Sequence, residues 1–162
     1  MSTIHIRPAT LEDIPAIEVI EKSCFTADRR SSLRALRHSL KSKSQSVWVA
    51  VADRGEIAGA MILYHHPRSI RIFSIGVLSA FRGAGAGRKM MEKALALARR
   101  ADCDAVILEA DEHDRRLTGW YEKFGFQIKK TLRDYHSPGA HAVRMRLSLK
   151  TALKGGRVRG RS

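Results

Sequence analysis

Three glycines spaced two residues apart are the chemically most informative feature of this sequence. They lie within Arg82–Gly87, between an apolar run from Ile70 to Leu78 and an amphipathic pattern that begins at Arg88. The first turn of a helix presents unpaired N–H groups and a partial positive charge, which suit a phosphate. Glycine lets the backbone approach such a ligand closely, and Arg82 and Arg88 add full charges. The segment therefore predicts a strand, a glycine turn and a helix that bind an anion, with pyrophosphate as the expected ligand.

Three other phosphate-binding motifs do not match these residues. The Walker motif requires Lys and then Ser or Thr after its last glycine, whereas Gly87 is followed by Arg88, Lys89 and Met90. The dinucleotide fingerprint opens the first strand–helix–strand unit with G-x-G-x-x-G, but these glycines alternate and lie in the middle of the chain. A kinase glycine loop would require H-R-D and D-F-G partners, and the sequence has neither.

The pattern Arg-x-x-Gly-x-Gly, formed by Arg82, Gly85 and Gly87, resembles the acetyl-CoA signature of the GNAT family of N-acetyltransferases. Two later segments extend the resemblance over about half of the chain, in the expected order. Ile107-Leu108-Glu109 followed by Trp120–Phe126 resembles a strand and a helix end of that family. Asp134–His136 through Val143–Leu147 resembles the closing hairpin of its ribosomal-protein-alanine (RimI-like) branch. Three motifs in register are far more specific than one glycine-rich turn.

The resemblance implies that acetyl-CoA is the co-substrate and that the reaction needs no metal. The residues that it places against the co-substrate are Ile75, Gly76, Val77, Arg82, Gly83, Ala84, Gly85, Ala86, Gly87, Arg88, Asp114 and Arg116.

Three residues at the start of the predicted helix 113–124 depart from the family pattern. Asp114 stands where the branch usually has an Asn that contacts the pantetheine arm, and an ionised Asp cannot donate a hydrogen bond. Arg115 and Arg116 replace small residues, and two interpretations are equally consistent with the sequence: a salt bridge to the 3′-phosphate of CoA, or a solvated face.

The resemblance assigns Glu109 as the general base and Tyr121 as the general acid. Glu109 ends an otherwise apolar strand, so its carboxylate could accept the proton of an ammonium directly or through water. The alternative is a solvated strand end, with Asp111 or Glu112 as the base. Tyr121 follows twelve residues later and could protonate a thiolate, since phenol and thiol have comparable pKa values; its alternative role is that of a core aromatic residue.

The remaining histidines and cysteines form no convincing catalytic or metal-binding set. No His, Cys, Asp or Glu spacing matches a metal site, and a nucleophilic Cys24 would need a base that the sequence does not reveal. Direct transfer without an acyl-enzyme is therefore favoured. By resemblance, Phe25 and Tyr135, in the segments 24–32 and 135–141, line the mouth for the acceptor.

The net charge of +14, from 30 Lys and Arg against 16 Asp and Glu, predicts a polyanionic partner. Five of these cations lie in residues 150–162, which we expect to form a disordered basic tail after a single domain, residues 1–149. A second basic cluster, residues 29–43, is interpreted first as a solvated helix face, with contact to a ribosome or RNA as the alternative.

Two distant cysteines without a secretory leader favour a cytoplasmic protein with reduced thiols, and no apolar run is long enough for a membrane span.

Hydrophobic periodicity predicts a mixed α/β domain with seven strands and about four helices. The buried face of the longest helix is expected at Met91, Ala94, Leu95 and Ala98. The expected strands are 3–7, 47–52, 57–64, 70–78, 105–110, 126–131 and 143–149, and the expected helices are 10–22, 31–40, 88–100 and 113–124.

The resemblance identifies this order as the GNAT fold, a mostly antiparallel sheet that splays between strands 4 and 5, with the thioester in the gap. The function that it implies is acetyl transfer to a primary amine, with a protein N-terminal α-amine as the leading acceptor. Two alternatives stay open: transfer to a small amine such as a polyamine, amino acid or aminoglycoside, or a non-catalytic RNA- or ribosome-binding module of the same fold.

Overall fold

The computed structural model describes residues 3–150, so all of the predicted basic tail except Lys150 lies outside the described residues. The strands are β1 (His5–Pro8), β2 (Gln45–Val51), β3 (Ile57–His65), β4 (Ser69–Val77), β5 (Ala105–Asp111), β6 (Gln127–Ser137) and β7 (Ala140–Ser148). The helices are α1 (Ile14–Cys24), α2 (Leu33–Lys41), α3 (Ala86–Arg100) and α4 (Arg115–Lys123), with short 3₁₀ turns at Leu11–Asp13 and Ser79–Phe81.

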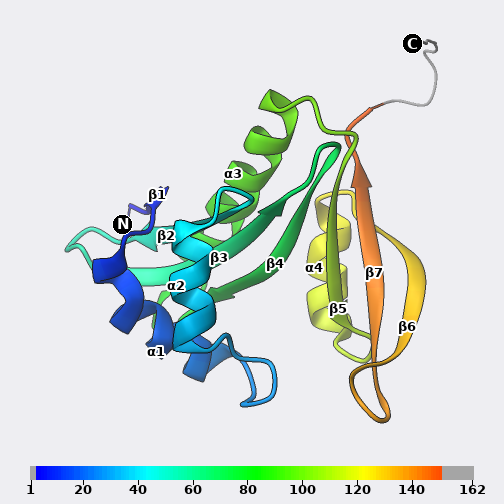
Figure 1. Ribbon diagram of the computed structural model, residues 1–162, viewed down its shortest axis with the longest axis horizontal. Coiled ribbons are helices and arrows are strands. Elements are labelled where there is room, and N and C mark those ends of the chain that lie inside the picture. Colours follow the sequence, from blue (N-terminus) through cyan, green and yellow to red (C-terminus); the bar gives the residue numbers. More distant parts are fainter. Residues whose placement is uncertain (1–2, 151–162) are drawn as a thin grey trace.

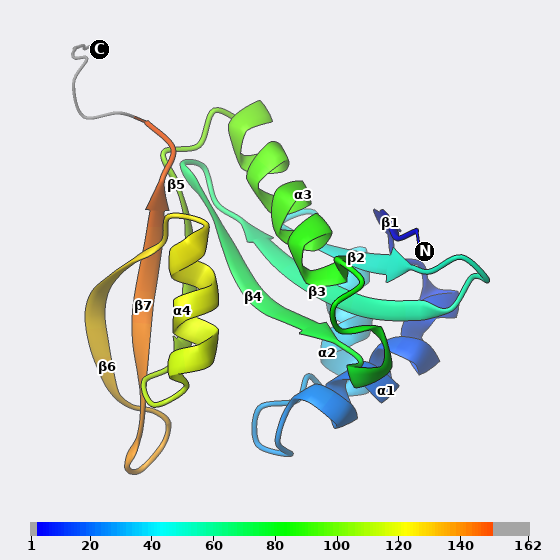
Figure 2. The ribbon, with the colours of Figure 1, turned by 180° about the vertical axis from the view of Figure 1, so that it is seen from behind.

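The strands form one sheet in the order β1-β2-β3-β4-β5-β7-β6 (Figure 1). All neighbours are antiparallel except β4 and β5, which are parallel. These two strands pair over only four positions, from Ser69 with Ala105 to Ile72 with Leu108. Beyond that point they diverge, as Figure 2 shows from behind. The mostly antiparallel α/β sheet that splays between its fourth and fifth strands is thus confirmed.

A β-bulge lies where β4 separates from β5. Leu63 of β3 pairs with Ile72, and the preceding Ile62 pairs with Ser74, so Phe73 has no partner on β3. A bulge adds one residue to a strand and increases its local bend. The bend and the loss of pairing with β5 therefore occur at the same place in β4.

Helices cover the two faces of the sheet unevenly. On one face, α1 and α2 bury Ile17, Ile20 and Leu36 against β2 and β3. On the other face, α3 packs on β1 to β5 with its predicted buried residues, all of which are buried in the structure, and α4 lies against β5 (Figure 2). Among the described residues, no helix covers β5, β7 and β6 on the face of α1 and α2 (Figure 1).

Two predicted boundaries are wrong in an informative way. Helix α3 begins at Ala86 rather than Arg88, because Gly85 adopts the left-handed conformation that starts it and the next two small residues join its first turn. The predicted loop 135–141 is instead a tight hairpin in which Ser137 pairs with Ala140, since Gly139 adopts a positive φ that closes the turn.

The close approach of β3 and β4 depends on Gly59. A Cβ at this position would lie 2.8 Å from the Gly76 carbonyl oxygen and 2.9 Å from Met90 Cε. We therefore expect Gly59→Ala to lower the free energy of unfolding, measured in urea, by about 1–3 kcal/mol. The control is Gly119→Ala in α4, where a Cβ meets nothing within 4 Å; it should raise stability by up to about 1 kcal/mol. Equal stability of Gly59→Ala and the wild type would contradict this packing.

Candidate active site

The glycine turn presents a row of unpaired N–H groups. Gly83 and Gly85 have φ values of +87° and +90°, which L side chains rarely adopt. The N–H groups of Gly85, Ala86, Gly87 and Arg88 donate to no acceptor among the described residues, as the first N–H groups of a helix do without a capping side chain. The first turn of α3 carries no acidic side chain that could occupy them. The turn therefore has the free donors and the space that a pyrophosphate requires.

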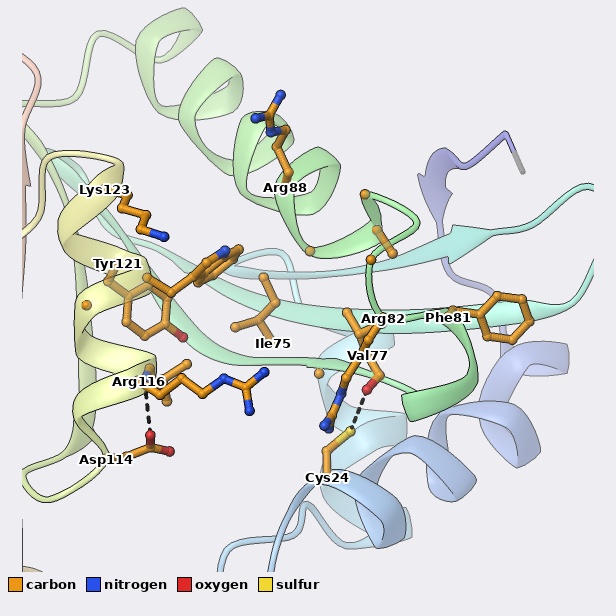
Figure 3. Close-up of a pocket in the computed structure, with 18 of the residues that line it drawn as sticks. Cys24, Ile75, Val77, Phe81, Arg82, Arg88, Asp114, Arg116, Tyr121 and Lys123 are labelled. Atoms are coloured by element: carbon orange, nitrogen blue, oxygen red, sulfur yellow. Dashed lines mark hydrogen bonds between the residues drawn. The ribbon is translucent and has the colours of Figure 1, made fainter. Parts of the chain in front are cut away.

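A cavity of about 1020 Å³ opens in front of this turn, at the upper end of the size range of small-molecule sites (Figure 3). It lies between the end of α1, the second half of β4, the glycine turn and α4. Its lining residues are Cys24, Phe25, Ile75, Gly76, Val77, Phe81, Arg82, Gly83, Gly85, Ala86, Gly87, Arg88, Asp114, Arg115, Arg116, Leu117, Gly119, Trp120, Tyr121 and Lys123. Five cations against one carboxylate make it electropositive.

The structure gathers most of the predicted site residues around this cavity. All of the predicted co-substrate residues line it except Ala84, and so do Phe25 and Tyr121. Glu109 and Tyr135 are not among its lining residues. Trp120 and Lys123 also line the cavity but were not predicted from the sequence, although both follow Arg116 at helical spacing on the face of α4 that lines the cavity.

The second half of β4 supplies one wall of the cavity. Ile75, Gly76 and Val77 pair with β3 on one side only, because β5 has already diverged on the other. Alternate peptide groups of this edge therefore point away from β3 and can bind an extended ligand, as an edge strand binds another strand.

Cys24 closes the α1 side of this wall. Its thiol donates to the Val77 carbonyl oxygen at 3.4 Å, and burial raises the pKa of the thiol although Arg82 opposes that shift. The thiol is thus protonated at neutral pH, which is the wrong form for a nucleophile.

Helix α4 holds Tyr121 in the opposite wall. Asp114 caps this helix by accepting a hydrogen bond from the Leu117 N–H at 3.0 Å. The Tyr121 ring is 4% exposed and packs on Trp120 and Phe126, with its hydroxyl directed into the cavity (Figure 3). Burial, together with the nearby Asp114 carboxylate, raises the pKa of Tyr121 above its ordinary value. Tyr121 therefore remains a proton donor throughout the neutral range.

Trp120 packs closely against the third glycine of the turn. A Cβ on Gly87 would lie 3.3 Å from Cζ2 of the Trp120 ring. The same ring packs edge-on against Phe124, with 4.9 Å between centroids. The two walls of the cavity therefore meet at Gly87 and Trp120.

Glu109 lies just past the last pair of β4 and β5 and is held by two arginines. Its Oε1 accepts from Arg71 Nε at 2.7 Å and its Oε2 accepts from Arg144 Nε at 3.0 Å. The Glu109 side chain is only 5% exposed. Because each oxygen already accepts from a guanidinium and the side chain is nearly buried, movement of one guanidinium or a relay through water would give the proton of an amine access to this carboxylate.

Tyr135 belongs to the same group of residues. Its hydroxyl accepts a hydrogen bond from Arg71 Nη2 at 2.7 Å, and 42% of the residue is exposed. It therefore lies on the sheet face beside Glu109, and not in the cavity wall.

No group of three or more His, Cys, Asp or Glu side chains within residues 3–150 is arranged to hold a metal ion. In the same part of the chain, no helix combines the length and apolar character that crossing a membrane requires.

Comparison with known proteins places the chain in a family. The model of the acetyltransferase (GNAT) family matches residues 14–126, so the chain belongs to that family. A Bacillus subtilis protein provisionally named as a [ribosomal protein bS18]-alanine N-acetyltransferase is 24% identical over 82% of this chain and 86% of its own length. The resemblance to the RimI-like branch is thereby confirmed.

Two further matches extend the comparison. N-alpha-acetyltransferase 30 of Xenopus laevis is 29% identical over 74% of this chain, but the chain spans only 45% of that protein's length. The crystal structure of the ribosomal-protein-S18-alanine N-acetyltransferase of Escherichia coli superimposes with a TM-score of 0.81 at 19% identity, covering 93% of this chain and 96% of that one. The structural match confirms the fold.

Burial of Tyr121 has a spectroscopic consequence. Because burial disfavours the phenolate, we expect part of the tyrosine ionisation, followed by ultraviolet absorbance, to be delayed well beyond pH 10, until the fold opens. Tyr121→Phe should abolish this delayed part, and Tyr135→Phe should retain it. A delayed part that survives in Tyr121→Phe would show that another tyrosine is the buried one.

Proposed function

We propose that this protein is an acetyl-CoA-dependent N-acetyltransferase that acetylates the α-amine of a protein N-terminus. One observation carries the proposal: the unpaired N–H groups of the glycine turn open into the cavity that also receives the Tyr121 hydroxyl. An anion-binding turn and a buried proton donor in one cavity suit a reaction that uses a phosphorylated carrier and releases a basic leaving group.

The residues around the cavity fit CoA by charge and by shape. The turn would hold the pyrophosphate, with Arg82 and Arg88 beside it, and the free edge of Ile75–Val77 would bind the amide groups of the pantetheine arm. Arg116 has the charge to bind the 3′-phosphate. Acetyl-CoA supplies the activated acyl group as a thioester.

The chain's own groups would then move two protons. Glu109 takes the proton of the acceptor ammonium, and the neutral nitrogen forms a bond to the carbonyl carbon, which a backbone N–H at the end of β4 polarises. Tyr121 gives its proton to sulfur as the C–S bond breaks, and the second proton of the nitrogen returns to Tyr121. Glu109 releases the first proton to solvent, so that both groups are restored. A protonated Cys24 supports this direct route over an acyl-enzyme.

An α-amine suits this site because its pKa near 8 leaves a substantial neutral fraction at physiological pH, unlike the lysine amine with a pKa near 10.4. The names of the two N-terminal and ribosomal-protein acetyltransferase relatives support the same acceptor class. Turnover of polyamines or other small amines in preference to peptides would replace this acceptor and leave the co-substrate unchanged.

Two matched glycine substitutions test binding of acetyl-CoA. Gly85→Glu places a negative side chain in the open space of the turn, so we expect affinity measured by isothermal titration to fall by roughly 100-fold or more, the effect of losing charge-assisted hydrogen bonds. Gly55→Glu is the control, since Gly55 also has a positive φ and no atom within 4 Å of a Cβ but lies in the β2–β3 turn. No binding of acetyl-CoA by the wild type would refute the proposal and favour a non-catalytic module.

Removal of the Tyr121 hydroxyl tests the proton donor. We expect Tyr121→Phe to lower kcat by roughly 10²–10⁴-fold in a thiol-release assay, the usual contribution of a positioned general acid. The affinity for acetyl-CoA should change little, because the ring and its packing remain. An unchanged kcat would assign the acid to another group.

A further inference from the structure

Two guanidinium groups share one carboxylate on the face of the sheet that also carries α1 and α2, where β4 adjoins the strands that no helix within residues 3–150 covers on this face. Arg71 of β4 and Arg144 of β7 each donate to a different oxygen of Glu109 on β5. Glu109 lies directly beyond the last β4–β5 pair, opposite Arg144 on β7, and Arg71 lies within the paired segment, opposite Ile107. This cluster, which we call the Glu109 clamp, therefore has one positive charge in excess.

Arg71 is fixed from several directions. Besides Glu109, it donates to the Tyr135 hydroxyl, and its guanidinium carbon lies 5.6 Å from the ring centroids of both Tyr64 and Phe73. These two rings stack on each other with 4.9 Å between centroids. Such packing restrains a side chain that would otherwise sample many rotamers.

Arg144 is held far less tightly. Only its Nε donates a hydrogen bond within residues 3–150, and 42% of its side chain is exposed. Its two terminal nitrogens are therefore available to a carboxylate that approaches from solvent, and a guanidinium binds such a group in a fork-like geometry.

The nearby acidic groups do not neutralise this excess charge. Asp111, two residues beyond Glu109, is engaged by Arg29 of the α1–α2 segment at 3.2 Å and by the His113 N–H at 2.8 Å. Asp134 of the hairpin accepts a hydrogen bond from the Gly139 N–H at 2.7 Å. The excess positive charge of the Glu109 clamp is therefore left to balance the carboxylate of a molecule that binds Arg144 from solvent.

We propose that the acceptor is a polypeptide with an acidic side chain close behind its amino terminus, and that Arg144 binds this carboxylate. This inference rests on the proposed N-terminal acetyltransferase function. The exchange of partners at Arg144 releases Oε2 of Glu109, which becomes free to accept the proton of the acceptor ammonium. One guanidinium–carboxylate pair replaces another, so the acidic acceptor itself would uncover the base.

A set of peptides tests the preference. They share an N-terminal Ala and differ only at the next two residues, which are Asp-Asp, Gln-Gln or Lys-Lys. For the wild type, kcat/KM should be roughly tenfold to 100-fold higher for the acidic than for the neutral peptide, the effect of one charge-assisted pair, and lowest for the basic peptide. The ratio should shrink as salt is added.

Three arginine variants assign the preference to one side chain. Arg144→Met should abolish the difference in kcat/KM between acidic and neutral peptides, because the charge that would bind the acceptor carboxylate is then gone. Arg144→Lys should keep part of the preference, which distinguishes charge recognition from damage to the fold. Arg146→Met is the matched control, since Arg146 lies two residues further along β7 on the same face, opposite Ile107, and should retain the full preference.

The outcomes separate this inference from the proposed function. Acetylation of all three peptides at similar rates, or an acidic preference that survives in Arg144→Met, would overturn the role of Arg144 and leave the acetyltransferase function standing. If acetyl-CoA binds but none of the peptides is acetylated, N-terminal acetylation itself fails and the inference fails with it.

Discussion

The separation of β4 from β5 is the constraint on which the rest of the structure depends. After four paired positions, each strand loses a neighbour, and its peptide groups need new partners because unpaired buried backbone groups are costly. On β5, pairing with β7 continues along the whole strand, so that side remains satisfied. On β4, no strand replaces β5, and the free edge becomes the wall of the cavity. The cavity is thus a place where the sheet leaves hydrogen-bonding capacity for a ligand.

The glycine turn and α4 complete what this separation begins. Helix α3 can start close to the free edge only because Gly85 adopts a left-handed conformation, and its first turn then directs unpaired N–H groups into the same space. Helix α4 fills the widening side of the gap with Trp120 and Tyr121. Tyr121, whose hydroxyl we assign as the proton donor, is buried there. The Glu109 clamp ties β4, β5 and β7 together at the opposite face, where no helix within residues 3–150 does so.

Local patterns in the sequence predicted much of this arrangement. The spacing of Met91, Ala94, Leu95 and Ala98 predicted the buried face of α3, and the alternation of glycines predicted the turn, because both depend on neighbours within a few residues. The partners of Glu109 were not predictable in this way, since Arg71 and Arg144 lie 38 and 35 residues away and reach it only through strand register. The cytoplasmic location and the contact with a ribosome or RNA stay predictions.

The bulge at Phe73 lets one strand serve two faces of the molecule. Before it, Arg71 shares a face with Tyr64, and Phe73 itself stacks on that ring. After it, the alternation of side chains is displaced by one residue, so that Gly76 faces Cys24 of α1 while Ile75 and Val77 pack with the core beneath α3 and α4. Had the strand continued through Phe73 with regular alternation and no bulge, the side chains of Ile75 and Val77 would point to the same face as Arg71. A single strand of nine residues therefore presents Arg71 to the Glu109 clamp on one face and Ile75 and Val77 to the core beneath α3 and α4 on the other.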